Sequence, residues 1–153
     1  MRLRLIWVGK TRNEHLRALV EEYLKRLSRF GRYEIMELRE STAREAREGI
    51  AEEGKRILNS LHQDSFAVLL DVQGRQYSSE ELAGQIERWQ VEGKKEVAFI
   101  IGGHNGVSAE VVKRANLRWS MSSLTLTHEM ARVLLVEQIY RAYTIIHGLP
   151  YQK

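Results

Sequence analysis

Two uninterrupted apolar segments constrain the fold of this chain most strongly. FAVLLDV occupies positions 66–72 and EVAFII occupies positions 96–101. Strands that are apolar on both faces are typical of a parallel sheet that helices cover on both sides. These two segments therefore predict an α/β fold.

Strand and helix patterns alternate along the chain. Strands are predicted at 2–8, 33–38, 66–72, 96–101 and 117–121. Helices are predicted at 14–30, 41–61, 78–93 and 128–147, with a short one from a Ser108 cap to Ala115. Thr42 and Glu45 predict a capping box for helix 41–61. Because no long linker or repeat interrupts the pattern, residues 1–153 are expected to form one domain, a parallel-rich sheet flanked by helices.

Positive charge is concentrated near the start of the chain. Residues 1–32 carry nine basic and three acidic side chains, whereas the net charge of the whole chain is only +4. A basic lobe of this kind favours a polyanionic partner, and nucleic acid is the usual one. Charge alone leaves open the alternative of a solvated helix face.

Composition excludes several classes of function. Cysteine is absent, so disulfides, a thiol nucleophile and thiolate metal sites are excluded. The spacing of the five histidines is not that of metal ligands, and we expect no metal. Neither a signal peptide nor an apolar run of membrane-spanning length is apparent, so we expect a cytoplasmic protein without a membrane partner.

A glycine-rich loop, IIGGHNG, follows the predicted strand 96–101. A dinucleotide fingerprint would need G-x-G-x-x-G after the first strand, and a phosphate loop would need Lys and Ser or Thr after the last glycine. The loop has G-G-x-x-G, and Val107 follows it. Both nucleotide patterns therefore fail, and a plain strand-to-helix turn remains open from the local sequence.

The position of this loop suggests a ligand site. Three segments follow predicted strands: LLDVQG, IIGGHNG and SMSSLTLTH. In open α/β sheets, ligands bind beyond the carboxyl ends of the strands. Glycine backbone with Leu70, Leu124 and Leu126 could accept a flat purine between apolar walls. Because no triphosphate clamp is present, the pattern favours a nucleoside-type cofactor over ATP.

The predicted helix 128–147 is apolar nearly all round. Such a helix must be covered on both sides, and in a chain this short we expect the second cover to be another subunit. Arg132 lies within the apolar face, where an arginine is rarely buried without a partner. Either it lies at the dimer seam and faces an anionic group, or it reaches solvent from the first turn.

Several motifs together resemble a known family. IIGGHNG, LTLTHEMARVLLVEQIYRA and the terminal PYQK, with VGK at 8–10 and IERW at 86–89, are similar to the SPOUT methyltransferases that modify N3 of a pseudouridine in 23S rRNA. The resemblance covers essentially the whole chain. It implies a homodimeric enzyme with a C-terminal trefoil knot, about residues 66–153, that binds S-adenosylmethionine. Since no separate RNA-binding module is present, the expected substrate is the assembled ribosome or large subunit.

The resemblance also implies particular site residues. Cofactor contacts are expected from Leu70, Gly102, Gly103, Met121, Ser122, Ser123, Leu124, Thr125 and Leu126. Candidates for the catalytic group are His128, Arg132, Glu137, Arg141 and Tyr151. We expect Arg141 or Arg132 to orient the base or stabilise its developing negative charge, with Tyr151 packed on the ring. His128 is expected to be neutral because the dipole at a helix N-terminus disfavours a cation.

Structural roles remain open for some of these residues. Glu137 and Arg141 could simply pair with each other, and Tyr151 could close the end of the helix.

This chain departs from the family pattern at two positions. Thr127 stands where the family commonly has proline before the histidine, and Gln152 stands where the family tail has histidine. A glutamine cannot act as a base, so a non-catalytic ribosome-binding protein that keeps the knot is the main alternative. The broken fingerprint disfavours a nucleotide-dependent oxidoreductase.

Overall fold

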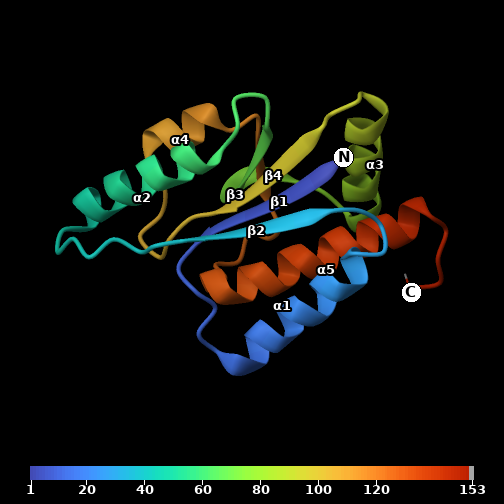
Figure 1. Ribbon diagram of the computed structural model, residues 1–153, viewed down its shortest axis with the longest axis horizontal. Coiled ribbons are helices and arrows are strands. Elements are labelled where there is room, and N and C mark those ends of the chain that lie inside the picture. Colours follow the sequence, from blue (N-terminus) through green and yellow to red (C-terminus); the bar gives the residue numbers. More distant parts are fainter. Residues whose placement is uncertain (152–153) are drawn as a thin grey trace.

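A five-stranded sheet forms the centre of the protein. The computed structural model describes residues 1–151. In chain order the elements are β1 (Arg2–Val8), α1 (Glu14–Leu27), β2 (Tyr33–Leu38), α2 (Ala46–Ser60), β3 (Phe66–Gln76), α3 (Ser79–Val91), β4 (Glu96–Ile101), α4 (Ala109–Arg114), β5 (Leu117–Ser120) and α5 (His128–Ile146). The strand order is β2-β1-β4-β3-β5, and every neighbouring pair is parallel (Figure 1). This confirms the predicted α/β fold class; the knot remains a prediction.

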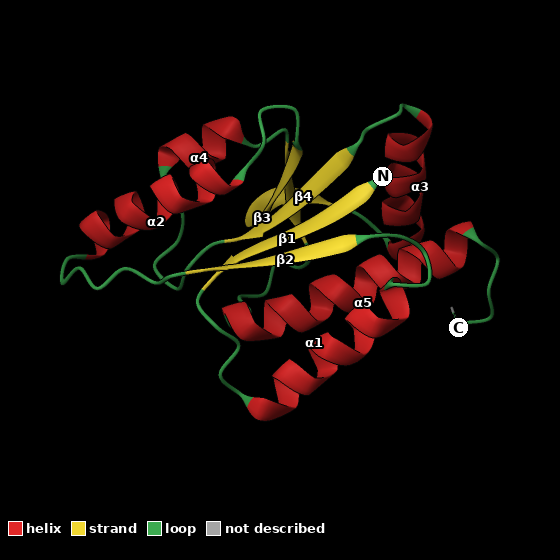
Figure 2. Cartoon of the chain, in the orientation of Figure 1, coloured by secondary structure: helices red, strands yellow, loops and turns green. Residues whose placement is uncertain are grey.

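Helices cover both faces of the sheet. Helices α2 and α4 lie on one face, and α1, α3 and α5 lie on the other (Figure 2). Along β1, Leu5 and Trp7 point into the larger core with α5, whereas Ile6 and Val8 point into the smaller core with α2. Successive side chains of a strand face opposite sides, so each of these central strands needs apolar residues at nearly every position. This is why β4 and the first half of β3 lack polar alternation.

The predicted start of α2 and the predicted end of β3 are wrong. Helix α2 begins at Ala46, and its N-cap residue Glu45 makes no capping bond with its side chain, so the Thr42–Glu45 capping box does not form. The preceding segment is held instead by Ser41, whose backbone N–H donates to Glu53 at 2.9 Å. Strand β3 continues past the predicted end at 72 to Gln76, because an irregularity after Leu70 lets it pair again with β5.

Helix α1 ends at Leu27, three residues before its predicted end. Ser28 is its C-cap, and Phe30 stacks on Tyr143 and His147 of the α5 region at ring distances of 5.4 and 5.1 Å. The chain leaves the helix early because this aromatic contact holds Phe30 against α5.

Helix α5 is covered within its own chain. It packs against both α1 and α3, and Leu135, Ile139 and Ala142 are fully buried. The expectation that a second subunit provides the second cover is therefore wrong. The periodicity of one helix shows that it needs two covers, but it does not show which elements provide them. The dimer itself remains a prediction.

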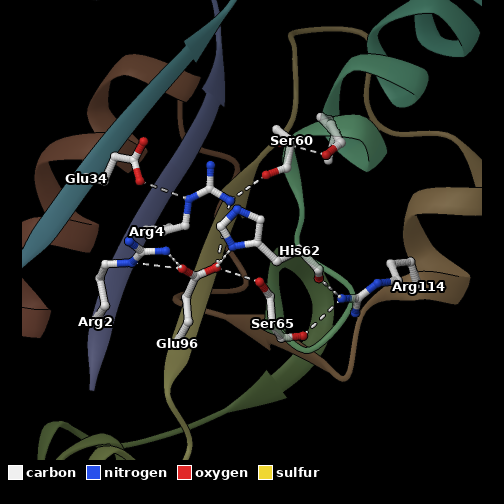
Figure 3. A network of polar contacts seen from close by, with 9 residues as sticks. Arg2, Arg4, Glu34, Ser60, His62, Ser65, Glu96 and Arg114 are labelled. Atoms are coloured by element: carbon white, nitrogen blue, oxygen red, sulfur yellow. Dashed lines mark hydrogen bonds and ion pairs between the residues drawn. The ribbon is translucent and has the colours of Figure 1, made fainter.

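A polar network joins the amino ends of β1 and β4 (Figure 3). The buried Glu96 carboxylate accepts from Arg2 Nε at 2.9 Å and from the Ser65 hydroxyl at 2.5 Å, and His62 Nδ1 lies 3.2 Å away. Burial alone would raise the pKa of Glu96, but the bonds from Ser65 and Arg2 hold it below its ordinary value. Arg4 is also buried, and it ion-pairs with both Glu34 and Glu96.

We expect Glu96→Gln to lower the free energy of unfolding by about 2 kcal/mol at neutral pH. Removing one member of a buried ion pair leaves its partners uncompensated, although the partly exposed Arg2 stays hydrated and limits the loss. Since the folded-state pKa is depressed, this stabilisation is present above the ordinary value of 4.5 and is lost as pH falls through the folded value. Urea unfolding of both proteins should therefore converge in acid.

Glu87→Gln is the matched control, because Glu87 is exposed on α3. Equal losses in the two variants, or a difference from wild type that persists in acid, would contradict the role given to Glu96.

Candidate functional site

Three strand ends meet around one pocket, as the sequence predicted. The pocket has a volume of about 460 Å³ and lies at the carboxyl ends of β3 and β4, against the loop that follows β5. Seven of the nine predicted cofactor contacts line it: Leu70, Gly102, Gly103, Met121, Ser122, Leu124 and Leu126. Ser123 and Thr125 belong to the same loop but do not line the pocket.

Glycine is required in this loop by close packing. A Cβ atom on Gly102 would collide with the side chain of Val107, and one on Gly103 would collide with Glu53 of α2. Gly106 has a φ of +100°, which other residues rarely adopt. Its N–H donates to the carbonyl of Gly103 at 3.0 Å and closes the turn. Because Gly102 and Gly103 have no side chains, the loop can pack closely against Val107 and against Glu53 of α2.

The polarity of the pocket suits an uncharged or cationic ligand. Among the described residues that line it there is no lysine or arginine. Its one carboxylate, Asp71, accepts from Arg118 Nε at 2.9 Å and from the Gln73 N–H at 2.9 Å. Burial would raise the pKa of Asp71, but these bonds hold it below its ordinary value, so the group is anionic. A triphosphate would find no cation in this lining, and because Arg118 already compensates Asp71, the wall carries little net charge.

His128 brings the first residue of α5 to the pocket wall. Burial first, and then the nearby Arg132, hold the pKa of His128 below its ordinary value. This direction favours the neutral imidazole, as expected from the sequence, and burial is the largest cause. Its ring lies 6.4 Å from that of His104 in the glycine loop. A neutral imidazole here can accept a proton from a ligand.

Arg132 is completely buried, so the alternative in which it reaches solvent is wrong. Its guanidinium donates to the carbonyl of Val8 at 2.7 Å and to the Thr11 hydroxyl at 2.9 Å. It also lies 5.1 Å from the centre of the Trp7 ring. Arg132 therefore ties α5 to the end of β1, and it does not line the pocket.

The other predicted catalytic residues form a separate group near the end of α5. The Tyr151 hydroxyl donates to Glu137 at 3.0 Å, Arg141 Nε donates to the same carboxylate at 3.1 Å, and the Arg141 guanidinium lies 4.8 Å from the Tyr151 ring. Tyr23 of α1 lies within 3.3 Å, hydroxyl to hydroxyl. The sequence left open that Glu137 and Arg141 pair with each other and that Tyr151 closes the end of the helix. Both contacts are present in the structure. We call Glu137, Arg141 and Tyr151 the tail cluster.

Comparison with known proteins identifies the family of this chain. A family model described as "Predicted SPOUT methyltransferase" matches residues 1–152. The chain belongs to the SPOUT methyltransferase family. It is 42% identical over 151 residues to the ribosomal RNA large subunit methyltransferase H of Gloeobacter violaceus, which covers 99% of this chain and 98% of the relative. Proteins of the same description from Streptococcus gordonii and Streptococcus pneumoniae are 41% identical over the full length of both chains.

In this SPOUT protein the candidate catalytic residues lie in two separate locations along α5. Thirteen residues of α5 separate His128 from Arg141, which corresponds to about 20 Å along the helix. His128 therefore belongs to the pocket, and the tail cluster lies well away from it in the same chain. Gln152, the departure from the family tail, lies outside the described residues.

Two features of the site were not predicted from the sequence. Asp71 is one of them, because a single acidic residue after a strand is no signal by itself, and only its position in the pocket distinguishes it. His104 has no partner in sequence, and its proximity to His128 depends on the fold. Within residues 1–151 there is no group of three or more metal-binding side chains, and no helix is long and apolar enough to cross a membrane.

Proposed function

We propose that this protein transfers a methyl group from S-adenosylmethionine to N3 of a pseudouridine in 23S rRNA, in the assembled ribosome or large subunit. The observation that carries the proposal is the pocket at the strand ends, in a chain of the SPOUT methyltransferase family. The names of the relatives support a ribosomal RNA substrate. Ribosomes as substrate agree with the cytoplasmic location expected from the sequence.

The pocket residues fit S-adenosylmethionine. Apolar walls suit its adenine, glycine backbone offers hydrogen bonds, and among the described lining residues no lysine or arginine repels the sulfonium. Ser123 and Thr125, which do not line the pocket, would contact the cofactor from the edge of the pocket. When bound, the cofactor supplies an electrophilic methyl group. The chain's own task is to hold donor and acceptor in line, which can lower a barrier by roughly 7–11 kcal/mol.

The remaining candidates act on the acceptor base. His128 is placed to accept the N3 proton, because it lines the pocket and is neutral. Arg132 supports it one helical turn further on by fixing α5 to β1. Tyr151 packs on the uracil ring, and Arg141 stabilises the negative charge that develops as the proton leaves. Glu137 orients both residues through the bonds already described.

The two places on α5 can serve one substrate only if a second copy of the chain participates. We therefore propose a homodimer through α5, in which the pocket of one subunit and the tail cluster of the other face the same nucleotide. Leu19 on α1 and Met130 on α5 support it, because these large apolar side chains remain 43% and 40% exposed on adjacent helices.

A non-catalytic ribosome-binding protein is the second candidate, and Gln152 in place of the family histidine favours it. Two measurements separate the possibilities. Calorimetry with S-adenosylmethionine is expected to show binding at the pocket, and ribosomes that lack the modification are expected to gain one methyl group per 23S rRNA. Cofactor binding without methyl transfer would favour the non-catalytic protein, and absence of both would refute the proposed function.

A further inference from the structure

The basic side chains of residues 1–32 do not form one uniform surface. Four of them pair with carboxylates: Arg2, Arg4, Arg12 and Arg26. Within the described residues, the other five have no ion pair: Lys10, Arg17, Lys25, Arg29 and Arg32. Charges that are already paired contribute little to the attraction of a polyanion. The five unpaired side chains are therefore the ones that can attract a polyanion.

Two of the unpaired cations line the same groove. Lys25 and Arg29 border a groove of about 540 Å³ at the end of α1, together with Glu22, Arg26, Ser28 and Tyr140. The one carboxylate of this groove, on Glu22, accepts from Arg26 at 3.0 Å. Arg26 also lies 5.7 Å from the centre of the Tyr140 ring. The groove therefore keeps two positive charges that no described residue compensates.

The helix dipole does not account for this arrangement. Cations are favourable in the last turn of a helix, and Lys25 and Arg26 occupy that turn of α1. Arg29, however, lies beyond the last helical residue, Leu27, and still lines the groove. The groove wall formed by Tyr140 belongs to α5 and has no part in capping α1.

The groove lies directly beside the tail cluster. The Tyr140 ring lines the groove and contacts the Tyr151 ring edge-on at 4.8 Å. Tyr23, on the same helix as Lys25, reaches the Tyr151 hydroxyl. A nucleotide ring at Tyr151 would thus have its neighbouring backbone within reach of Lys25 and Arg29.

We infer that this groove binds the phosphodiester backbone of the rRNA strand next to the acceptor nucleotide. The inference rests on the proposed function and names the surface that holds its substrate. Lysine and arginine contacts to phosphate provide affinity and register, while an aromatic wall offers a face for a base. This combination fits RNA better than an acidic protein, because the tyrosine ring can stack on a base while the two cations contact the phosphates.

The test is a double variant, Lys25→Gln with Arg29→Gln, in the full-length protein. The matched control is Arg47→Gln with Lys55→Gln, which removes the same two charges from exposed positions of α2 on the opposite face of the sheet (Figure 1). For ribosomes lacking the modification, the groove variant should show about a tenfold higher KM with unchanged kcat and unchanged S-adenosylmethionine affinity. The salt dependence of binding to a 23S rRNA fragment should fall by about 0.7 in log–log slope per lost contact.

Each outcome decides a different question. If both double variants match wild type in KM and salt slope, the groove does not hold RNA. Weaker binding to whole subunits with unchanged binding to the rRNA fragment would assign the groove to an acidic protein surface instead, and would overturn the inference. If wild type binds subunits through the groove but transfers no methyl group, the proposed function fails while the groove stands. Thermal unfolding of all variants checks that folding is unaffected.

Discussion

Replacing Gly102 with valine is expected to weaken S-adenosylmethionine binding at least about 100-fold. Any Cβ at this position meets the side chain of Val107, which also lines the pocket, so a branched side chain must push Val107 aside or project into the ligand space. Loss of the flat glycine wall removes the surface on which an adenine would lie. Calorimetry with the purified variant measures the effect directly.

Gly84→Val is the matched control for Gly102→Val. A Cβ at Gly84 of α3 meets nothing within 4 Å, and valine is a better helix former than glycine. We expect full cofactor affinity and slightly raised stability. If Gly102→Val binds S-adenosylmethionine as tightly as Gly84→Val, the pocket at the strand ends is not the cofactor site.

Tyr151→Ala is expected to lower the rate of methyl transfer more than about 100-fold, with cofactor affinity and dimer formation unchanged. The alanine variant loses the ring that packs on the base, together with the contact between that ring and the Arg141 guanidinium. Tyr151→Phe keeps the ring and should retain most of the activity. Single-turnover methylation of ribosomes measures both variants. Turnover of Tyr151→Ala at the wild-type rate would remove Tyr151 from the site.

Mixed dimers then test whether two subunits share one site. Gly102→Val lacks a usable pocket and Tyr151→Ala lacks the tail ring, so each alone should be inactive. If the pocket of one subunit works with the tail cluster of the other, random mixing restores about one quarter of the wild-type rate, because half of the dimers contain one intact site. A mixture as inactive as its components would show that each site lies within a single chain, and would refute the shared site.

Local patterns were sufficient where a residue's role depends on its neighbours in sequence. The predicted Ser108 cap of α4 forms because its partner, the N–H of Val111, lies three residues away. The glycine loop could be placed at a ligand site because the carboxyl ends of parallel strands lie along one edge of the sheet. The Thr42–Glu45 box failed because distant carboxylates on α2 hold Ser41 and leave the segment extended.

For the candidate site, the sequence by itself determined the α/β sheet, the glycine loop and the apolar wall of Leu70, Leu124 and Leu126, since apolar runs and strand ends specify these. The other predicted cofactor contacts were implied by the family resemblance. Only the tertiary structure decided which charged side chains are already bound to other residues of the chain. Arg132 is bound to Val8 and Thr11, more than 120 positions away, and Arg2 is bound to Glu96. The tertiary structure also divided the catalytic candidates between the two ends of α5. Contacts between residues so far apart in the chain arise from packing, and no local pattern encodes them.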